Sequence, residues 1–335
     1  MQSKLYATHI PTKVRHNATK KHTTGHIRMC MAILEILPVN LREAFTQVPL
    51  DEVNELRLRS NSPVIIMASG RNFYLTAQGL SDKPFGAISV TRTDLDTIVH
   101  KASNYSVYAI NEQLKCGFIT IKGGIRIGLT GEVVQEKGEI YTIKNIQSLN
   151  IRIPHQVKGC SYPVLDYIFV NPRPLRTLII SPPGSGKTTF LRDLAWQTSD
   201  KYHLLNTLII DERGEIAATH LGDCQLNVGT NTDVITGGSK IFGFENGLRS
   251  MRPDLIITDE VATESDIEML RLASKSGVGL IATVHAGGID EIRLKPYFKD
   301  LIDEQIFDRY VVLGIGDTPG KVMGVFDKNL KLMAM

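Results

Sequence analysis

The sequence has 335 residues, of which 42% are apolar and 22% are charged, proportions typical of a soluble globular protein. This length exceeds that of one ordinary domain and fits two. No apolar run reaches the roughly 20 residues that a membrane-spanning helix needs, so any membrane contact is expected to be peripheral. The four cysteines form no C-x-x-C pair, which argues against a zinc site or a disulfide framework and favours a cytoplasmic protein.

Basic residues are concentrated at the N-terminus, where residues 1–30 hold six Lys or Arg and no Asp or Glu. Removing these six from the total of 38 leaves 32 basic against 35 acidic residues in the remaining 305. This body has a net charge of −3 and is not expected to contact nucleic acid directly. We interpret residues 1–30 as a disordered basic leader, as sequence before a mis-assigned start (Met29 or Met31 being the true one), or as a transit peptide.

Two helices are predicted in the first part of the body. Apolar residues recur at near-helical spacing over residues 31–47, and Pro38 is expected to interrupt that helix. A second helix is predicted over residues 95–103, with Thr93 or Asp94 as its N-cap.

Short alternating apolar and polar runs separated by turn residues predict strands in the same region. These strands are expected at residues 53–59, 64–68, 73–75, 114–122, 125–129 and 148–154. The first three read as an antiparallel meander, and the next two as a hairpin around Gly123 and Gly124. Residues 31–154 are therefore predicted to form a small α+β domain that ends in a linker.

The pattern changes from residue 155 onward, where strands alternate with helices. Strands are predicted at residues 175–181, 204–211, 255–259, 279–285, 309–313 and 322–326. Helices are predicted at residues 187–199 and 263–276, the latter with Gly277 as its C-cap. Near-continuous apolar strands between helices indicate an α/β domain with a mainly parallel sheet covered on both faces, spanning residues 155–335.

A phosphate-binding loop is predicted between the first strand of this domain and the helix after it. Residues 181–188 match G-x-x-x-x-G-K-[ST] except that Ser181 replaces the first glycine. Gly184 and Gly186 let the backbone curl so that its amides face phosphate oxygens, and the helix N-terminus favours negative charge. Lys187 would reach the β and γ phosphates, and the Thr188 hydroxyl would ligate Mg²⁺. The residues predicted to bind ATP are Pro183, Gly184, Ser185, Gly186, Lys187, Thr188 and Thr189.

Three further strands end in polar residues, where open α/β sheets bind their ligands. Asp259 and Glu260 follow an apolar strand; Asp259 would hold Mg²⁺ and Glu260 would polarise the water that attacks the γ-phosphate. Glu212 follows another strand and is interpreted as orienting the water or the metal. His285 ends a third strand, where it is interpreted as sensing ATP against ADP. The arginines considered as partners for the γ-phosphate are Arg126, Arg152, Arg213, Arg249 and Arg252.

In order and spacing, these motifs resemble the family of stage III sporulation protein AA, a relative of the type II and type IV secretion ATPases. The resemblance covers residues 31–328 and rests on segments 56–59, 117–120, 128–134, 148–152, 182–189, 191–193, 211–217, 232–234, 249–254, 259–260, 282–285 and 309–313. It implies a RecA-like P-loop core, with Glu212 in an acidic box and His285 in a histidine box. It also implies a hexameric ring on the cytoplasmic face of a membrane, energising a secretion-like channel through inner-membrane components.

This sequence departs from the family pattern at Ser181, at Ala262, where a glycine commonly follows the acidic pair, and in residues 1–30. Three functions remain open at this point. The first is a secretion-type motor that hydrolyses ATP with Mg²⁺. The second is a nucleic-acid-handling P-loop ATPase, which would need a basic groove or stacking aromatic residues. The third is a nucleotide-gated assembly factor with little hydrolysis.

Overall fold

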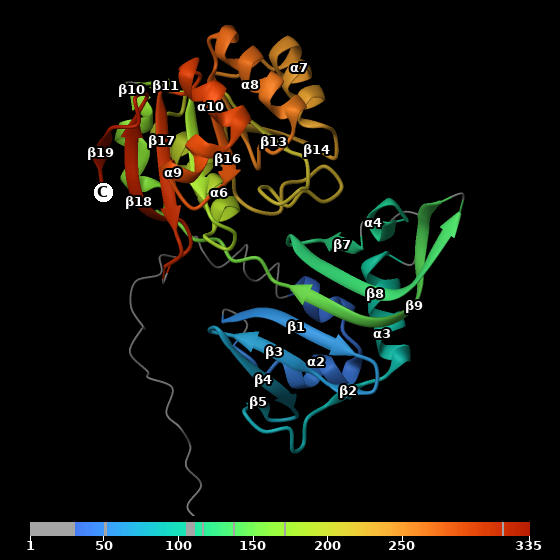
Figure 1. The fold of residues 1–335 in the computed structure, drawn as a ribbon. Helices are drawn as coiled ribbons and strands as arrows, with labels where there is room; N and C mark the ends of the chain where they lie inside the picture. Colours follow the sequence, from blue (N-terminus) through green and yellow to red (C-terminus); the bar gives the residue numbers. More distant parts are fainter. Residues whose placement is uncertain are drawn as a thin grey trace, which may run out of the picture.

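The computed structural model describes residues 31–49, 52–104, 111–115, 117–136, 138–170, 172–316 and 318–335. The leader proposed for residues 1–30 lies outside the described residues, as do Cys30 and Cys116. Two large β-sheets organise the described chain, one before residue 155 and one after it (Figure 1).

The first sheet has seven antiparallel strands in the order β5-β4-β3-β1-β9-β8-β7. Its strands are β1 (Val53–Arg59), β3 (Ile65–Ala68), β4 (Arg71–Thr76), β5 (Gly79–Ser81), β7 (Phe118–Ile121), β8 (Ile125–Glu136) and β9 (Glu139–Arg152). Two short strands, β2 (Ser62–Pro63) and β6 (Ser89–Val90), pair beside it. The predicted meander and the predicted hairpin are both confirmed.

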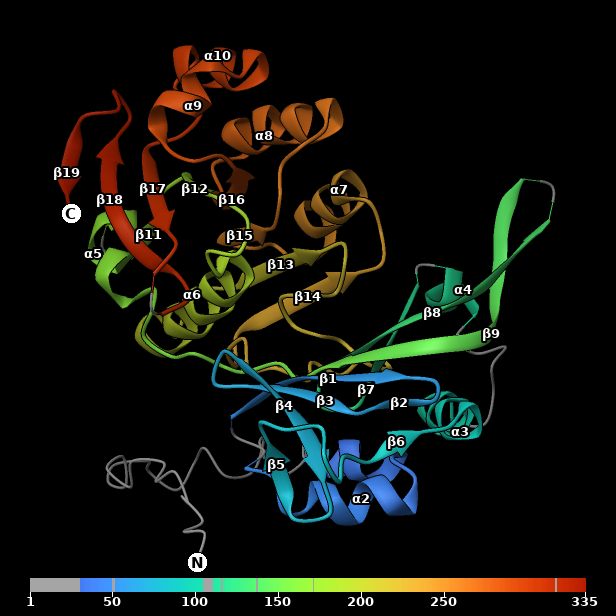
Figure 2. The same cartoon turned by 60° about the horizontal axis from the view of Figure 1, so that its bottom comes forward.

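Helices pack on this sheet through apolar side chains. Residues 31–36 are helical, and α2 (Val39–Phe45) begins directly after Pro38, so the predicted interruption is confirmed. Leu41 and Phe45 of α2 are buried in one cluster with the inward-facing residues of the strands. The remaining helices of this part are α3 (Arg92–Ala102) and α4 (Asn111–Lys115), and Figure 2 shows α2 and α3 below the sheet.

Two boundary predictions in this part are wrong. Helix α3 is capped by Thr91, whose hydroxyl accepts from the Asp94 amide at 3.2 Å while the Asp94 carboxylate accepts from the Thr91 amide at 2.8 Å. Asp94 is therefore the third helical residue of a capping box rather than the cap. Residues 114 and 115 belong to α4, and the strand starts only at Phe118, after the chain turns at Gly117, where φ is +77°.

The second sheet has eight strands in the order β14-β13-β15-β16-β12-β17-β18-β19. Its strands are β12 (Thr177–Ser181), β13 (Thr207–Asp211), β14 (Thr232–Thr236), β15 (Leu255–Thr258), β16 (Gly279–His285), β17 (Arg309–Gly314), β18 (Lys321–Asp327) and β19 (Leu332–Ala334). The pairs from β14 to β17 are parallel, whereas β18 and β19 are added antiparallel. The predicted fold class, a mainly parallel α/β core preceded by an α+β part, is confirmed.

Helices cover both faces of this sheet. They are α6 (Lys187–Lys201), α7 (Lys240–Ser250), α8 (Glu264–Ser276), α9 (Ile289–Leu294) and α10 (Pro296–Asp303). One apolar cluster joins the sheet to α6 and to α5 (Leu165–Ile168), and a second joins its other face to α7, α8 and α10. The predicted C-cap of α8 is confirmed, because Gly277 adopts φ +77°. A small hairpin of β10 (Phe169–Val170) and β11 (Arg173–Pro174) completes this part.

The two parts of the chain touch through a few specific contacts. The Gly123 amide donates to the Gln225 side chain at 2.7 Å, and the Arg126 guanidinium lies 2.5 Å from the Glu215 carboxylate. Residues 153–158, between the two parts, have no regular secondary structure, and we propose that they are the linker between two domains. No helix within the described ranges is both long and apolar enough to cross a membrane.

Helix α7 has no counterpart among the predicted elements, because Gly243 and Gly247 interrupt its apolar face. Both glycines are buried against β13. A Cβ at Gly243 would lie 2.8 Å from Cγ2 of Ile210, a stiff β-branched side chain that is almost completely buried. The missing side chains therefore let the helix approach the strand closely.

We expect Gly243→Ala to destabilise the protein even though alanine is the better helix former. Helix propensity favours alanine by about 1 kcal/mol, but overpacking a tight core costs about 1–3 kcal/mol. Urea unfolding would measure the change, with the exposed Glu245→Ala on the same helix as a control expected to stay within about 0.5 kcal/mol. An increase in the free energy of unfolding for Gly243→Ala would contradict this packing.

Candidate active site

The predicted phosphate-binding loop connects β12, which is buried along its whole length, to the N-terminus of α6. Gly184 and Gly186 adopt φ values of +79° and +87°, a left-handed conformation in which glycine is strongly preferred. Gly186 has a second reason to lack a side chain, because a Cβ there would lie 2.6 Å from the Cβ of Pro319. The loop backbone between strand and helix is thus curled as the sequence motif requires.

Ser181, the departure from the motif, is accommodated without strain. It is the last residue of β12 and keeps a negative φ, so the position does not need the conformational freedom of glycine. Its buried hydroxyl lies 2.6 Å from the hydroxyl of Ser185 and ties the start of the loop to its middle. The serine therefore braces the loop from inside.

Helix α6 begins at Lys187 and presents the amides of its first turn at the loop. Amides in the first turn of a helix have no partner within the helix, and together with the helix dipole they attract anions. Thr188 and Thr189 are half-buried in this turn, whereas Pro183 and Gly184 are exposed on the loop. Ser185 is held by its carbonyl oxygen, which accepts from the Gly320 amide at 2.7 Å.

The Lys187 ammonium reaches across to the strand at the centre of the sheet. Its Nζ lies 2.8 Å from Nδ1 and 2.9 Å from Nε2 of His285, and His285 Nε2 lies 3.5 Å from a carboxylate oxygen of Glu260. Partial burial lowers the pKa of Lys187, and burial together with the Lys187 charge lowers the pKa of His285. The imidazole is therefore favoured in its neutral form, which can accept a hydrogen bond from the ammonium. The structure brings three predicted catalytic residues into one contiguous chain of contacts.

Two aspartates lie at the carboxyl ends of neighbouring strands. The pairing of β13 with β15 places Ile210 opposite Thr258, so Asp211 and Asp259 leave the sheet side by side. Asp211 is fully buried and its carboxylate accepts three amides, those of residues 215, 216 and 217, at 2.8–3.0 Å. Burial, reinforced by the charge of Asp211, raises the pKa of Asp259 to about 6. Asp211 thus shapes the following loop, and Asp259 is a buried carboxylate of unusual basicity.

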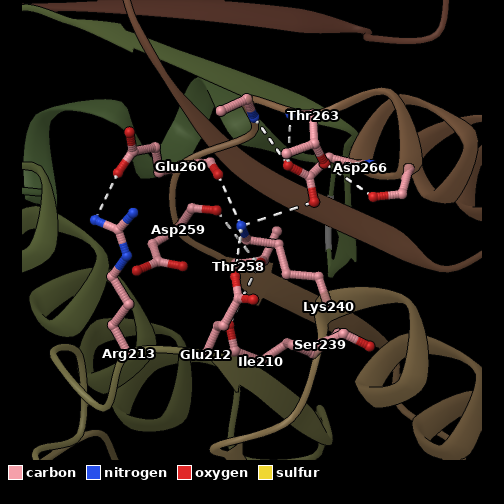
Figure 3. A network of polar contacts seen from close by, with 12 residues as sticks. Ile210, Glu212, Arg213, Ser239, Lys240, Thr258, Asp259, Glu260, Thr263 and Asp266 are labelled. Atoms are coloured by element: carbon pink, nitrogen blue, oxygen red, sulfur yellow. Dashed lines mark hydrogen bonds and ion pairs between the residues drawn. The ribbon is translucent and has the colours of Figure 1, made fainter. Parts of the chain in front are cut away.

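Glu260 is held by a charged group on its second carboxylate oxygen, the one that does not face His285. The Arg213 guanidinium donates to this oxygen at 3.2 Å (Figure 3). Of the five arginines considered from the sequence, Arg213 contacts a predicted site residue. Arg126 pairs with Glu215, in the loop that also carries Arg213. Arg152 lies 3.6 Å from Glu55, and Arg249 lies 3.8 Å from Glu245.

Glu212 points at a residue that the sequence analysis did not single out. The Lys240 ammonium, at the first residue of α7, donates to the Glu212 carboxylate at 3.0 Å and to the main-chain oxygen of Glu260 at 2.8 Å (Figure 3). Lys240 was missed because α7 was missed; the Gly-Gly-Ser turn before it, with Ser239 as the N-cap, was the available signal.

The residues predicted to hold Mg²⁺ offer the right donors. Thr188 and Asp259 supply oxygen atoms, which this hard cation prefers, and Mg²⁺ usually takes few protein ligands beside phosphate oxygens and water. The oxygen donors of Thr188 and Asp259 thus fit Mg²⁺. The described ranges contain no group of three or more His, Cys, Asp or Glu side chains arranged to hold a metal.

Similar proteins were found by sequence and by structure. Stage III sporulation protein AA of Bacillus subtilis is 38% identical over 303 residues, which is 89% of this chain and 95% of that protein. The uncharacterized protein ycf45 of Porphyra purpurea is 26% identical over 285 residues, or 84% of this chain and 44% of that protein.

Among solved structures, the pilus retraction motor PilT with bound ADP shares 16% identity at a TM-score of 0.56, covering 90% of this chain and 83% of that one. The ATPase DotB of Legionella pneumophila shares 16% identity at a TM-score of 0.50, covering 81% and 74%. These likenesses confirm the RecA-like fold expected from the sequence. The sequence model of the family described as sporulation stage III, protein AA, matches residues 28–333, and the chain therefore belongs to this family.

Proposed function

We propose that this chain binds ATP with Mg²⁺ at residues 183–189 and hydrolyses it to ADP and phosphate. The observation that carries the proposal is the chain of contacts from Lys187 through His285 to Glu260, which begins at the first residue of α6. A single side chain, that of His285, thus links a loop that can hold phosphates to a carboxylate that can orient water. Such an arrangement serves phosphoryl transfer, where positioning and electrostatic stabilisation supply most of the catalysis.

The contacts suggest how each side chain acts. The Lys187 ammonium lies against the His285 ring, and we expect it to turn toward the β and γ phosphates when ATP binds. Glu260 would then orient the attacking water, while Arg213 holds the outer oxygen of its carboxylate. Once Lys187 had moved to the phosphates, His285 would sense the γ-phosphate from the end of β16. Bound Mg²⁺, shared by Thr188, Asp259 and the phosphates, would neutralise the developing charge.

The family and the fold support a more specific role. The chain belongs to a sporulation family, and its fold is that of proteins described as a pilus retraction motor and an ATPase. We therefore propose a motor of the secretion-ATPase type that assembles as a ring, with six copies expected. Movement between residues 31–154 and 155–335 would convert hydrolysis to force on inner-membrane components of a secretion-like channel. The protein would act at the cytoplasmic face of that membrane, without direct nucleic acid contact.

Lys187→Ala is expected to weaken ATP binding by about tenfold or more, because it removes a charged hydrogen-bond donor to phosphate. Isothermal titration calorimetry with Mg²⁺ and ATP would measure the affinity. Lys201→Ala is the matched control, since Lys201 lies at the far end of the same helix in an exposed ion pair with Asp166. If both variants bound ATP as tightly as the wild type, the assigned binding site would be wrong.

Glu260→Gln is expected to keep ATP affinity and to lose turnover by about a hundredfold or more, because it removes a general base without changing the shape of the side chain. Phosphate release under saturating ATP is the measurement, with the exposed Glu264→Gln as a control that should keep wild-type turnover. Wild-type turnover no higher than that of Glu260→Gln would instead support a nucleotide-gated assembly factor. Stimulation of the wild type by DNA would support the nucleic-acid-handling function.

Ring formation is expected to depend on nucleotide, because in the proposed ring each bound ATP would contact the neighbouring copy as well as its own loop. Light scattering of purified protein with and without ATP would give the mass, using Glu260→Gln to prevent turnover. A multiple of the 37.1 kDa chain mass in the presence of ATP is expected. A monomer under both conditions, up to micromolar concentration, would argue against the motor.

A further inference from the structure

Lys240 is a buried lysine in an unfavourable place. Its side chain is 8% exposed, although lysines are almost never buried unless they are paired. It is also the first residue of α7, where the positive end of the helix dipole disfavours a cation. A residue that is electrostatically unfavourable for its own helix must be compensated by partners elsewhere.

Those partners come from three other segments. The Lys240 ammonium donates to the Glu212 carboxylate at 3.0 Å and to the Glu260 main-chain oxygen at 2.8 Å, and it lies 3.7 Å from the Asp266 carboxylate (Figure 3). Glu212 follows β13, Glu260 follows β15, and Asp266 belongs to the capping box of α8. One charged group therefore joins the ends of two strands and the beginnings of two helices.

The contact with Glu260 completes the restraint of its backbone. The Glu260 amide donates to the Thr283 hydroxyl at 2.8 Å, and the Val261 amide donates to the Thr283 main-chain oxygen at 2.7 Å. Lys240 holds the remaining polar group of the Glu260 main chain, its carbonyl oxygen. With its main chain fixed on both sides, the residue has few directions left for its carboxylate, which lies 3.5 Å from His285.

We propose that Lys240 is a positioning residue for ATP hydrolysis: it fixes the main chain of Glu260, and with it the carboxylate that orients water, without touching the nucleotide. The inference rests on the proposed function and extends it to a residue on α7. It also gives Glu212 a supporting role as the counter-charge that makes a buried ammonium tolerable. A purely structural lysine would change stability and leave the catalytic step alone.

Lys240→Met keeps the length of the side chain and removes its charge and donors. We expect kcat to fall about tenfold or more while the KM for ATP stays within about threefold, because the phosphate-binding loop is untouched. Lys240→Arg, which retains donors and charge, should recover part of the loss. The control is Lys275→Met, at an exposed lysine in the last turn of α8, which should turn over ATP like the wild type.

A double variant separates positioning from stability. If Lys240 acts through Glu260, Lys240→Met should add almost nothing to the loss already caused by Glu260→Gln when single-turnover rates are compared. A full tenfold further loss in the Glu260→Gln background, or an unchanged kcat in Lys240→Met alone, would overturn the inference. Should Lys240→Met fail to fold, Lys240→Gln takes its place in both backgrounds, with the same two outcomes. Absence of turnover in the wild type would instead reject the proposed ATPase.

Discussion

Four carboxylates converge where β13 and β15 end, and compensating their charge is the constraint on which the site depends. In-register parallel pairing makes the convergence unavoidable, because each strand carries two acidic residues directly after its apolar run. Three of the four have a partner of their own: three backbone amides for Asp211, Lys240 for Glu212 and Arg213 for Glu260. Asp259 has no such partner among the hydrogen bonds described, and burial raises its pKa to about 6. A carboxylate left in this state is well suited to receive a cation.

The phosphate-binding loop faces this acidic cluster from the other side of β16. Lys187 and His285 occupy the space between them, so the positive side of the site and its negative side are joined by a neutral imidazole. Under the proposed function, this link would transmit nucleotide binding to Glu260: if the ammonium moved to phosphate, the ring would lose its hydrogen-bond donor and its nearest positive charge. The same contacts would then connect binding, catalysis and the strand that carries His285.

The N-terminal part enters this region through one ion pair. Arg126 of β8 contacts Glu215, whose amide is bound by Asp211, and its guanidinium also stacks 3.7 Å above the Phe118 ring. The loop after β13 is therefore held by two groups. One is the buried carboxylate at the end of its own strand, and the other is an arginine from the first sheet. Because this loop also carries Glu212 and Arg213, movement of the N-terminal part is expected to be transmitted to residues around Glu260.

The sequence by itself determined the motif residues, the strands that carry them and the mainly parallel sheet, because these depend on short-range patterns: apolar runs, turn glycines and acids at strand ends. It also determined the family. It did not reveal helix α7, whose apolar face is broken by Gly243 and Gly247 to fit against Ile210 and Leu208, nor therefore Lys240. The pairing of Arg213 with Glu260 and the tolerance of Ser181 were likewise decided only by tertiary structure. Those contacts join residues up to 47 positions apart, and a distance between side chains is set by packing, which no local pattern encodes.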